Sequence, residues 1–278
     1  MERRKKANVV EGEKLSPATV RLMSMLGQVD AENYLRPEGR DKIAQVMSFL
    51  PLMEKVLSVT SKRKPLSILE CACGKGHLSL LLNQILMERY DRELLFIGID
   101  SSERLVEKCR RIAGDMGYGN VEYHVSTIAD FDSEGIDMLL SLHACDTATD
   151  ESLVKGLELG CRFVFLVPCC QSELSRQLTE VEQPLYLPMT GNYTHRKILG
   201  SLLTDSLRRL VLEAFGYKVD VFEYVSVRRT EKNIMMRAVR GSKPDADSWR
   251  LFLKILSDLN LEMRLERMME DRGLRPEF

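Results

Sequence analysis

A turn containing two glycines, followed downstream by an acidic residue, is the first feature of this sequence that can do chemistry. Gly74 and Gly76 lie between an apolar run and an amphipathic stretch. A chain without Cβ atoms turns tightly there and lets a ligand approach its backbone. Asp100 closes the next apolar run, where a carboxylate can accept hydrogen bonds from ribose hydroxyls. The combination predicts a ligand that contains a nucleoside.

The turn departs from the fingerprint of nicotinamide and flavin enzymes. That fingerprint is G-x-G-x-x-G, and its third glycine position is occupied here by Ser79. The departure argues against a dinucleotide-dependent oxidoreductase.

The elements around the turn alternate between strands and helices. Apolar runs predict strands at 65–72, 94–100, 121–125, 136–142 and 162–167. Amphipathic stretches predict helices at 76–90, 102–116 and 150–159, with Ser101 or Ser102 as an N-cap. Near-continuous apolar strands separated by helices indicate an α/β fold with a parallel sheet covered on both faces. Such sheets bind ligands at their carboxyl edge.

The pattern differs on both sides of this core. Residues 1–64 are predicted to be helical and free of strands, and Pro51 marks a boundary within 40–59. Beyond the fifth strand we expect an irregular stretch at 171–193, a helix at 197–215, a hairpin from 217–227 and 233–239, and a final helix at 247–272. The expected parts are a helical extension or lid (1–64), the α/β domain (65–240) and a C-terminal helix (241–278).

Polar and sulfur-bearing residues follow the fourth and fifth strands. His143 is a candidate general base, or a residue that orients the cofactor or a loop. Cys169 and Cys170 are candidate nucleophiles, or thiols that fill small spaces. Asp146 and Asp150 suit helix caps, Asp150 in particular. The cysteines lack the paired spacing of a structural zinc site, so no metal is expected.

The segment 70–76 resembles motif I of the class I methyltransferases, acidic-x-G-x-G-x-G. Glu70 takes the acidic place, and Ala72, Gly74 and Gly76 take the glycine places. The resemblance implies a Rossmann-like sheet, mostly parallel with a C-terminal antiparallel hairpin, and S-adenosylmethionine as cofactor. It implies that Glu70 contacts the amino group of the methionine moiety and that Asp100 contacts the ribose. The implied cofactor-binding residues are Glu70, Cys71, Ala72, Cys73, Gly74, Lys75, Gly76, His77, Asp100, Ser101, Thr127, Ile128, Leu142 and His143.

A narrower resemblance rests on three segments, which are the run from Gly74 to Ser79, the set His143, Cys145, Thr149 and Asp150, and the pair Cys169 and Cys170. Over about residues 65–240 they resemble the methyltransferase domain of glutathione S-transferase C-terminal-domain-containing proteins. The tRNA 2′-O-methyltransferases are more distantly similar. In those tRNA enzymes His-His often follows the second cysteine, where this chain has Gln171-Ser172. The resemblance implies catalytic roles for His143, Asp146, Cys169 and Cys170.

The acceptor is predicted from the region after the fifth strand. Residues 186–240 contain ten Lys or Arg and five acids, a local excess of five positive charges. The residues expected to contact a substrate are Gln171, Asn192, Tyr193 and Arg196, because aromatic, amide and cationic groups together suit RNA. A solvated helix face explains many of the same charges. The net charge of −1 for the whole chain keeps a protein or small-molecule acceptor open, and a cofactor-binding scaffold without catalysis is a third possibility.

The setting of the protein is predicted from its cysteines and its hydropathy. Several of the seven cysteines fall in apolar runs, which is typical of reduced thiols in a cytoplasmic protein. No stretch approaches the roughly 20 apolar residues of a membrane span. The oligomeric state is left open.

Overall fold

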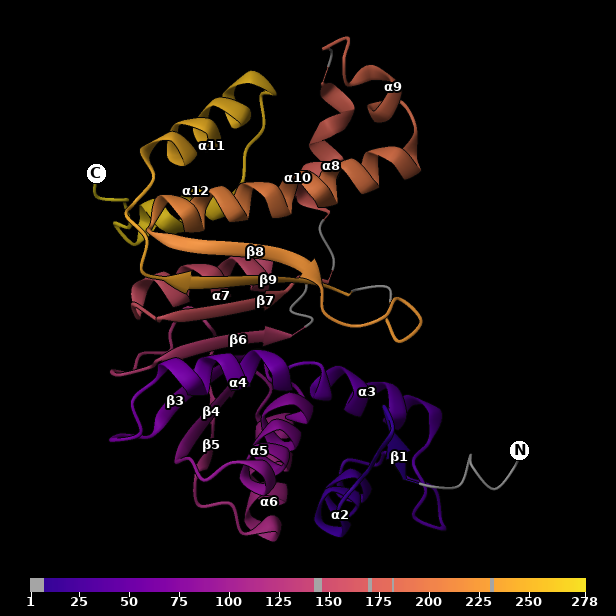
Figure 1. The fold of residues 1–278 in the computed structure, drawn as a ribbon. Helices are drawn as coiled ribbons and strands as arrows, with labels where there is room; N and C mark the ends of the chain where they lie inside the picture. The colour runs from indigo at the N-terminus through magenta and orange to yellow at the C-terminus, as the bar shows by residue number, and fades with distance from the viewer. Residues whose placement is uncertain (1–7, 143–146, 170–171, 182, 231–232) are drawn as a thin grey trace. The chain divides into compact units, whose positions relative to one another are not determined.

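The computed structural model of the protein describes residues 8–142, 147–169, 172–181, 183–230 and 233–278. The chain divides into two compact units (Figure 1). The first comprises Met1–Phe131 and Glu223–Asn233, and the second comprises Asp132–Phe222 and Ile234–Phe278. These boundaries differ from those of the three parts expected from the sequence. The division into three parts stays a prediction.

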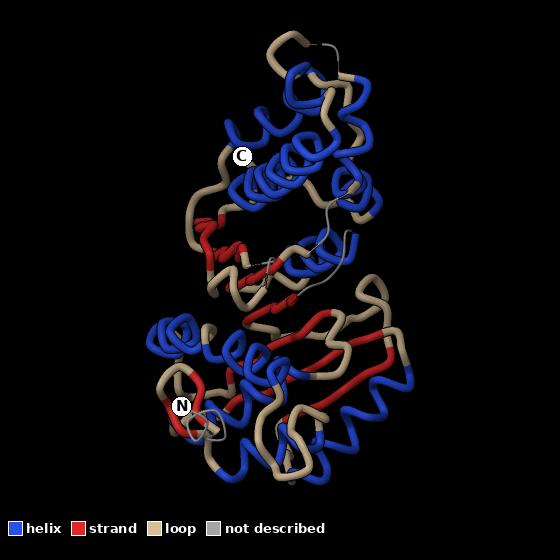
Figure 2. Tube along the Cα trace, turned by 90° about the vertical axis from the view of Figure 1, so that its right-hand side faces the viewer, coloured by secondary structure: helices blue, strands red, loops and turns tan. Residues whose placement is uncertain are grey.

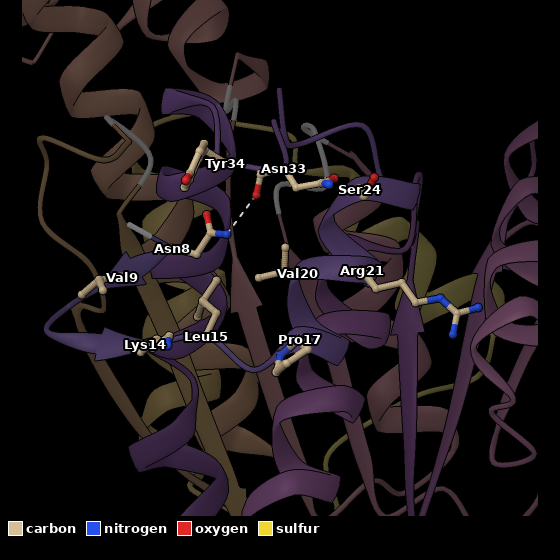
Figure 3. Close-up of a pocket in the computed structure, with 10 residues that line it drawn as sticks. All are labelled: Asn8, Val9, Lys14, Leu15, Pro17, Val20, Arg21, Ser24, Asn33 and Tyr34. Carbon is tan, nitrogen blue, oxygen red and sulfur yellow. Dashed lines mark hydrogen bonds between the residues drawn. The ribbon is translucent and has the colours of Figure 1, made fainter. Parts of the chain in front are cut away.

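The first unit is built on a parallel sheet with the strand order β5-β4-β3. Its strands are β3 (Leu66–Cys71), β4 (Leu94–Asp100) and β5 (Val121–Val125), as the sequence predicted. Helices α5 (His77–Arg89) and α6 (Glu103–Met116) pack against β4 and β5. Figure 2 shows the strands in red, running side by side with helices beside them. Every residue of β3 is buried, including the polar Ser67 and Glu70, as expected of a parallel strand that is covered on both faces.

The N-terminal part of this unit is not purely helical. Strands β1 (Val9–Val10) and β2 (Glu13–Lys14) form a small antiparallel hairpin, so the expectation of no strand before residue 65 was wrong. Glu11 and Gly12 between them both have positive φ, as a two-residue hairpin turn of type I′ requires. Helix α2 (Pro17–Met25) follows. Pro51 then separates α3 (Pro37–Met47) from α4 (Leu50–Val59), as predicted.

A distant piece of the chain, 223–233, completes this unit. The guanidinium of Arg229 pairs with the carboxylates of Asp41 and Glu11, with an N–O distance of 2.8 Å to each. The ring of Tyr224 meets Phe49 edge to face at 5.6 Å between centroids. The segment therefore packs on the N-terminal elements through charge and aromatic contact.

The second unit carries the other strands, in the order β6-β7-β9-β8. Strands β6 (Met138–Leu142) and β7 (Phe163–Val167) are parallel, and β9 (Ile234–Arg240) is antiparallel to β7. Strand β8 (Tyr217–Glu223) lies beside β9 and runs in the opposite direction (Figure 1). Helix α7 (Thr147–Glu158) packs on β6 and β7. The predicted α/β Rossmann-like fold, mostly parallel with a C-terminal antiparallel hairpin, is confirmed.

The remaining helices differ from the prediction in three places. The stretch expected to be irregular contains α8 (Glu173–Gln177), the 3₁₀ turn η1 (Leu178–Glu180) and α9 (Leu187–Thr190). Helix α10 (Tyr193–Ala214) begins four residues earlier than expected. The expected single C-terminal helix is two helices, α11 (Ala246–Asp258) and α12 (Arg264–Asp271). In the described part of the chain, no helix has the length and apolar character needed to cross a membrane.

Candidate functional site

The turn between β3 and α5 has the left-handed backbone that its glycines allow. The φ angle is +57° at Gly74 and +66° at Gly76, which is the N-cap of α5. Ala72 also has a positive φ, +52°, although it carries a Cβ. A non-glycine residue in this region is strained by about 1–2 kcal/mol. The turn is therefore held in place by contacts that offset this strain.

The two glycines serve different purposes. A Cβ at Gly76 would lie 2.9 Å from Sγ of Cys109 and 2.9 Å from Oη of Tyr123, so packing beneath the helix requires glycine. A Cβ at Gly74 would meet nothing closer than a carbonyl oxygen of Ala72 at 4.0 Å. The side of the turn at Gly74 is thus open, and a ligand can approach the backbone there.

Asp100, the last residue of β4, lies at this turn. Its Oδ2 accepts a hydrogen bond from the backbone N–H of Gly74 at 2.8 Å, and its Oδ1 accepts one from Ser102 at 2.9 Å. Ser102 is the N-cap residue of α6, but its own side chain makes no capping bond. The carboxylate of Asp100 therefore joins the turn to the start of α6.

Glu70, at the end of β3, is a buried carboxylate with a neighbour that the sequence analysis missed. The backbone N–H of Ser79 donates to its Oε2 at 3.1 Å. Burial raises the pKa of Glu70 to about 7, against the lowering effect of the Ser79 hydrogen bonds, and the charge of Asp100 raises it further. Glu70 is thus poised to lose its proton when a cation arrives.

Ser79 also contacts Tyr123, which completes a buried polar group with Glu70. The hydroxyls of Ser79 and Tyr123 lie 2.8 Å apart. Burial raises the pKa of Tyr123 well above its usual value, so its hydroxyl stays protonated. The sequence analysis treated Ser79 only as a missing glycine. Alternating burial along β5 places Tyr123 inward, and this was the signal that could have found it.

Cationic residues surround the first residue of α5. Burial, followed by the charges of Lys42, Lys75 and Lys108, lowers the pKa of His77 to about 3. Burial and the charge of Lys75 also lower the pKa of Lys42. The ring Nε2 of His77 lies 3.5 Å from the amide nitrogen of Gln28. His77 is consequently neutral in a positive environment.

The segment 126–130, which contains the predicted cofactor-binding residues Thr127 and Ile128, follows β5. The backbone N–H of Ser126 donates to the carbonyl of Asp100 at 3.1 Å, which fixes the segment at the end of β4. The Thr127 hydroxyl donates to Asp130 at 2.6 Å, and Ile128 is buried. Ser101 is exposed beside Asp100. These residues of the first unit therefore gather at the carboxyl ends of neighbouring strands.

The predicted residues after the fourth and fifth strands are only partly described. His143, Asp146, Cys170 and Gln171 lie outside the described residues. Leu142 is the last residue of β6 and is half-buried, and so is Cys169, which follows β7.

The expectation that Asp150 caps α7 was wrong. The helix begins at Thr147, so Asp150 lies inside its first turn. Its Oδ1 accepts a 2.7 Å hydrogen bond from Nε of Arg208, and both side chains are almost fully buried. Asp150 therefore ties α7 to α10 inside the second unit.

The predicted substrate residues that the structure describes lie at the start of α10. The side chain of Asn192 caps the helix by accepting from the backbone N–H of His195 at 3.1 Å. Tyr193 is 71% exposed, and the guanidinium carbon of Arg196 lies 6.0 Å from its ring centroid. Arg196 also donates to the carbonyl of Thr190 at 2.7 Å. The three residues are thus neighbours on one helix end.

Within the described residues, no group of three or more His, Cys, Asp or Glu is arranged to hold a metal ion. The described cysteines of the turn, Cys71 and Cys73, are buried thiols. The hydrogen bond with Cys109, followed by burial, raises the pKa of Cys73 far above its usual value, which disfavours the thiolate that metals bind.

The fold and the turn define a Rossmann-like methyltransferase of class I, and comparison with known families agrees. Residues 41–177 match a family model described as "Methyltransferase domain". The matched residues therefore carry an S-adenosylmethionine-dependent methyltransferase domain. No curated protein sequence matches the chain.

Solved structures of several methyltransferases are similar to this one. Magnesium protoporphyrin IX methyltransferase from Synechocystis, solved with bound SAH, has 17% identity and a TM-score of 0.46, covering 81% of this chain and 95% of its own. The plantazolicin methyltransferase in complex with SAH has 14% identity and a TM-score of 0.42, covering 81% and 95%. A dimethyladenosine transferase from Plasmodium falciparum has 14% identity and a TM-score of 0.39, covering 72% and 64%. At such values these enzymes say nothing about the acceptor of this protein.

Proposed function

We propose that Glu70 and Asp100 hold S-adenosylmethionine over the turn at residues 72–76. A buried carboxylate with a pKa near 7 is matched by an ammonium group, which the methionine moiety carries. The carboxylate of Asp100 suits ribose hydroxyls, since an oxygen that already accepts one N–H retains further lone pairs. The open side of Gly74 provides room for the ligand, so the residues present fit the cofactor.

The cofactor supplies a methyl group bound to a positively charged sulfur. Transfer to a nucleophilic acceptor depends chiefly on how the two are aligned, so the protein needs few acid or base groups. Glu70 and Asp100 would hold the cofactor from the ends of two neighbouring strands. His143, Asp146, Cys169 and Cys170 remain proposed catalytic residues.

We propose further that the acceptor is RNA, and one observation carries this proposal. Lys42, Lys75 and Lys108 all lie close enough to His77 to lower its pKa, and none of them pairs with a carboxylate among the described residues. Lysines that have no acidic partner beside a reaction site attract a polyanion. The narrower resemblance, which includes tRNA-modifying enzymes, supports the same acceptor class.

The test measures cofactor binding and methyl transfer separately. Titration calorimetry with S-adenosylmethionine establishes the first, and tritium transfer from labelled cofactor to RNA of a strain that lacks the gene establishes the second. We expect saturable binding and label that ribonuclease releases. Binding with label only in a ribonuclease-resistant fraction would overturn the RNA acceptor and leave the cofactor proposal intact.

Lys42 separates the acceptor from the cofactor in this test. If the lysines serve RNA, Lys42→Ala raises the apparent KM for RNA several-fold and leaves the Kd for S-adenosylmethionine unchanged. If they serve the carboxylate of the methionine moiety, the cofactor Kd rises instead. Lys55→Ala is the matched control, because Lys55 is an exposed lysine on α4 of the same N-terminal part.

A protein or small-molecule acceptor is the second candidate, and the pairing of the basic residues favours it. Much of the positive charge at 186–240 is neutralised inside the protein. The paired residues in that region are Arg208 with Asp150 and Asp205, Arg209 with Glu213, Arg237 with Asp220, and Arg229 with Asp41 and Glu11. The charge excess counted along the sequence therefore overstates the cationic surface. Label in a ribonuclease-resistant fraction would support this candidate.

A further inference from the structure

A pocket in the second unit lies between α8 with η1 and the first turns of α10. Its volume is about 360 Å³, at the small end of the range for ligand sites, about 300–1,000 Å³. Its walls contain three cationic side chains, one aromatic ring and three hydroxyl residues, which are Arg176, Arg196, Lys197, Tyr193, Ser172, Ser175 and Thr179. No carboxylate lines it.

The two walls are held together by direct backbone contact. A Cβ at Gly200 of α10 would lie 2.6 Å from Cβ and 2.7 Å from Cα of Ser175 in α8. Only glycine permits this approach. Leu174 and Leu178, on the opposite side of the short helical segment, are fully buried. The pocket is consequently a fixed feature between packed helices.

The hydroxyl groups in the walls already have partners. Ser175 donates to the carbonyl of Ser172 at 3.0 Å, and Thr179 donates to the carbonyl of Arg176 at 2.8 Å. These bonds hold the segment in its helical shape. Most of the side-chain hydrogen-bond donors left to face a ligand therefore belong to the cations.

The cations are not neutralised by the protein. Within the described residues, none of Arg176, Arg196 and Lys197 forms an ion pair. Arg196 is positioned by its bond to the carbonyl of Thr190 and by the ring of Tyr193. Three like charges in one small pocket repel one another, and an anion relieves that repulsion. The guanidinium groups suit phosphate because they offer several N–H donors in one plane.

We infer that this pocket binds a backbone phosphate of the acceptor RNA, with a neighbouring base stacked on Tyr193. The inference rests on the proposed RNA acceptor and names the place where the strand is held. Tyr193 distinguishes a nucleic acid from a free phosphate, because its ring is 71% exposed at the rim of the cationic pocket. Aromatic rings beside cations are the usual means of holding single-stranded nucleic acid.

The test measures RNA binding by anisotropy of a fluorescein-labelled single-stranded RNA of mixed sequence. The variant is Arg176→Ala with Lys197→Ala, which removes two cations and leaves Arg196 in place. We expect the Kd for RNA to rise about tenfold or more, because the loss of each charged contact raises the Kd by about three- to tenfold or more. The salt dependence of log Kd should fall by about 0.7 per lost contact. Tyr193→Ala should weaken binding, and Tyr193→Phe should not.

Two controls accompany the variant. Lys243→Ala removes an exposed cation of the same unit outside the pocket and should leave the RNA Kd within twofold. The Kd for S-adenosylmethionine and the melting temperature are measured for every variant. Unchanged values exclude misfolding as the cause of weaker RNA binding.

The outcomes separate this inference from the proposed function. If the wild type binds RNA without methylating it and the double variant does not bind RNA, the result supports the proposed pocket and overturns the proposal that RNA is the acceptor. If both proteins bind and methylate RNA equally well, the result overturns the proposed pocket and supports RNA as the acceptor. A wild type that binds no RNA overturns both.

Discussion

Glu70 acts on α5 from the end of a neighbouring strand. Ser79 is the third residue of that helix, and its N–H is one of the donors that have no partner within a helix. The carboxylate of Glu70 supplies the partner at 3.1 Å. A negative charge near a helix N-terminus is favourable, yet burial of Glu70 outweighs this benefit and raises its pKa. Glu70 is therefore a buried carboxylate that ionises near neutral pH.

This residue should make folding stability depend on pH. The pKa of Glu70 is about 7 in the folded protein against an ordinary value of 4.5. Its contribution is therefore fully present below about pH 4.5 and is lost as pH rises to 7. The loss is on the order of 3 kcal/mol. Denaturant unfolding of Glu70→Gln and wild type across this range should show the variant gaining relative stability as pH rises. A constant difference would contradict the assignment.

Cofactor binding should follow the opposite trend. An ammonium beside Glu70 lowers the pKa of the carboxylate, so binding releases a proton below pH 7. The affinity for S-adenosylmethionine should rise up to about pH 7 and level off above it. Calorimetry in two buffers of different ionisation enthalpy detects the released proton. Glu70→Gln should bind more weakly and without proton release.

Asp100 should matter for both the turn and the ribose. Asp100→Ala removes both backbone hydrogen bonds and the ribose acceptor, so we expect S-adenosylmethionine affinity to fall by roughly 1–3 kcal/mol. Asp100→Asn keeps one acceptor oxygen and should lose less. Calorimetry on both variants, with circular dichroism as the folding control, measures the difference. Equal affinities for wild type and Asp100→Ala would mean that the cofactor lies elsewhere.

Residue types at strand ends were predictable, but their partners were not. Glu70 and Asp100 follow from motif spacing, because parallel strands bring their carboxyl ends to one edge. Ser79 and Tyr123 depend on how α5 and β5 face each other, which no local pattern encodes. The pairing of Arg208 with Asp150, 58 positions apart, is of the same kind.

At the scale of elements, the turn and its two glycines offer a paired experiment. Gly74→Ala adds a Cβ on the open side and strains only the backbone, at about 1–2 kcal/mol. Gly76→Ala adds the same strain together with contact against Cys109 and Tyr123, for a total of about 2–4 kcal/mol. Thermal unfolding should therefore rank Gly76→Ala as the less stable. Gly74→Ala should keep the fold and lose cofactor affinity, and the reverse ranking would contradict this reading of the turn.

The contact between α7 and α10 should be a major source of stability in the second unit. Arg208→Ala removes the guanidinium from the buried carboxylate of Asp150, and breaking a buried ion pair costs about 3–5 kcal/mol. Arg209→Ala is the matched control, since its pair with Glu213 is partly exposed and worth under about 1 kcal/mol. Denaturant unfolding compares the two. Similar small losses would mean that Arg208 contributes no more than a surface residue.

The ends of elements were predicted well where the sequence contains a residue that interrupts a helix. Pro51 predicted the boundary between α3 and α4. The break between α11 and α12 carries neither proline nor glycine. There Asn260 adopts φ +49°, and the N–H of Leu261 donates to the carbonyl of Leu256 at 2.9 Å. The apolar spacing continues across the break, so the sequence predicted a single helix.

At the scale of the whole molecule, the N-terminal residues belong to the first unit and are more than a cover over it. Leu22, Met23, Ile43 and Met53 are fully buried. The hydroxyl of Ser16 contacts the side chain of Glu88 in α5. The side chain of Arg21 contacts the backbone carbonyl of Asp115 in α6. A removable lid would bury little apolar surface of its own.

A protein that begins at Pro65 should therefore fail to fold its first unit. The truncation exposes the apolar surfaces of α5 and α6 that α2 and α3 cover. We expect the loss of a cooperative thermal transition and of S-adenosylmethionine binding. A truncated protein that unfolds cooperatively and binds cofactor normally would support the lid interpretation of residues 1–64.

The segment 223–233 gives the molecule an unusual connectivity. The chain leaves the first unit after Phe131, returns to it at Glu223 and leaves again after Asn233. A cut between residues 131 and 132 would thus leave the first unit incomplete in either fragment, because its segment 223–233 stays with the C-terminal fragment. The N-terminal fragment would lack Tyr224 and Arg229, the partners of Phe49, Asp41 and Glu11. Separately produced fragments should consequently recover cofactor binding only when mixed, which makes this enzyme a natural candidate for fragment complementation.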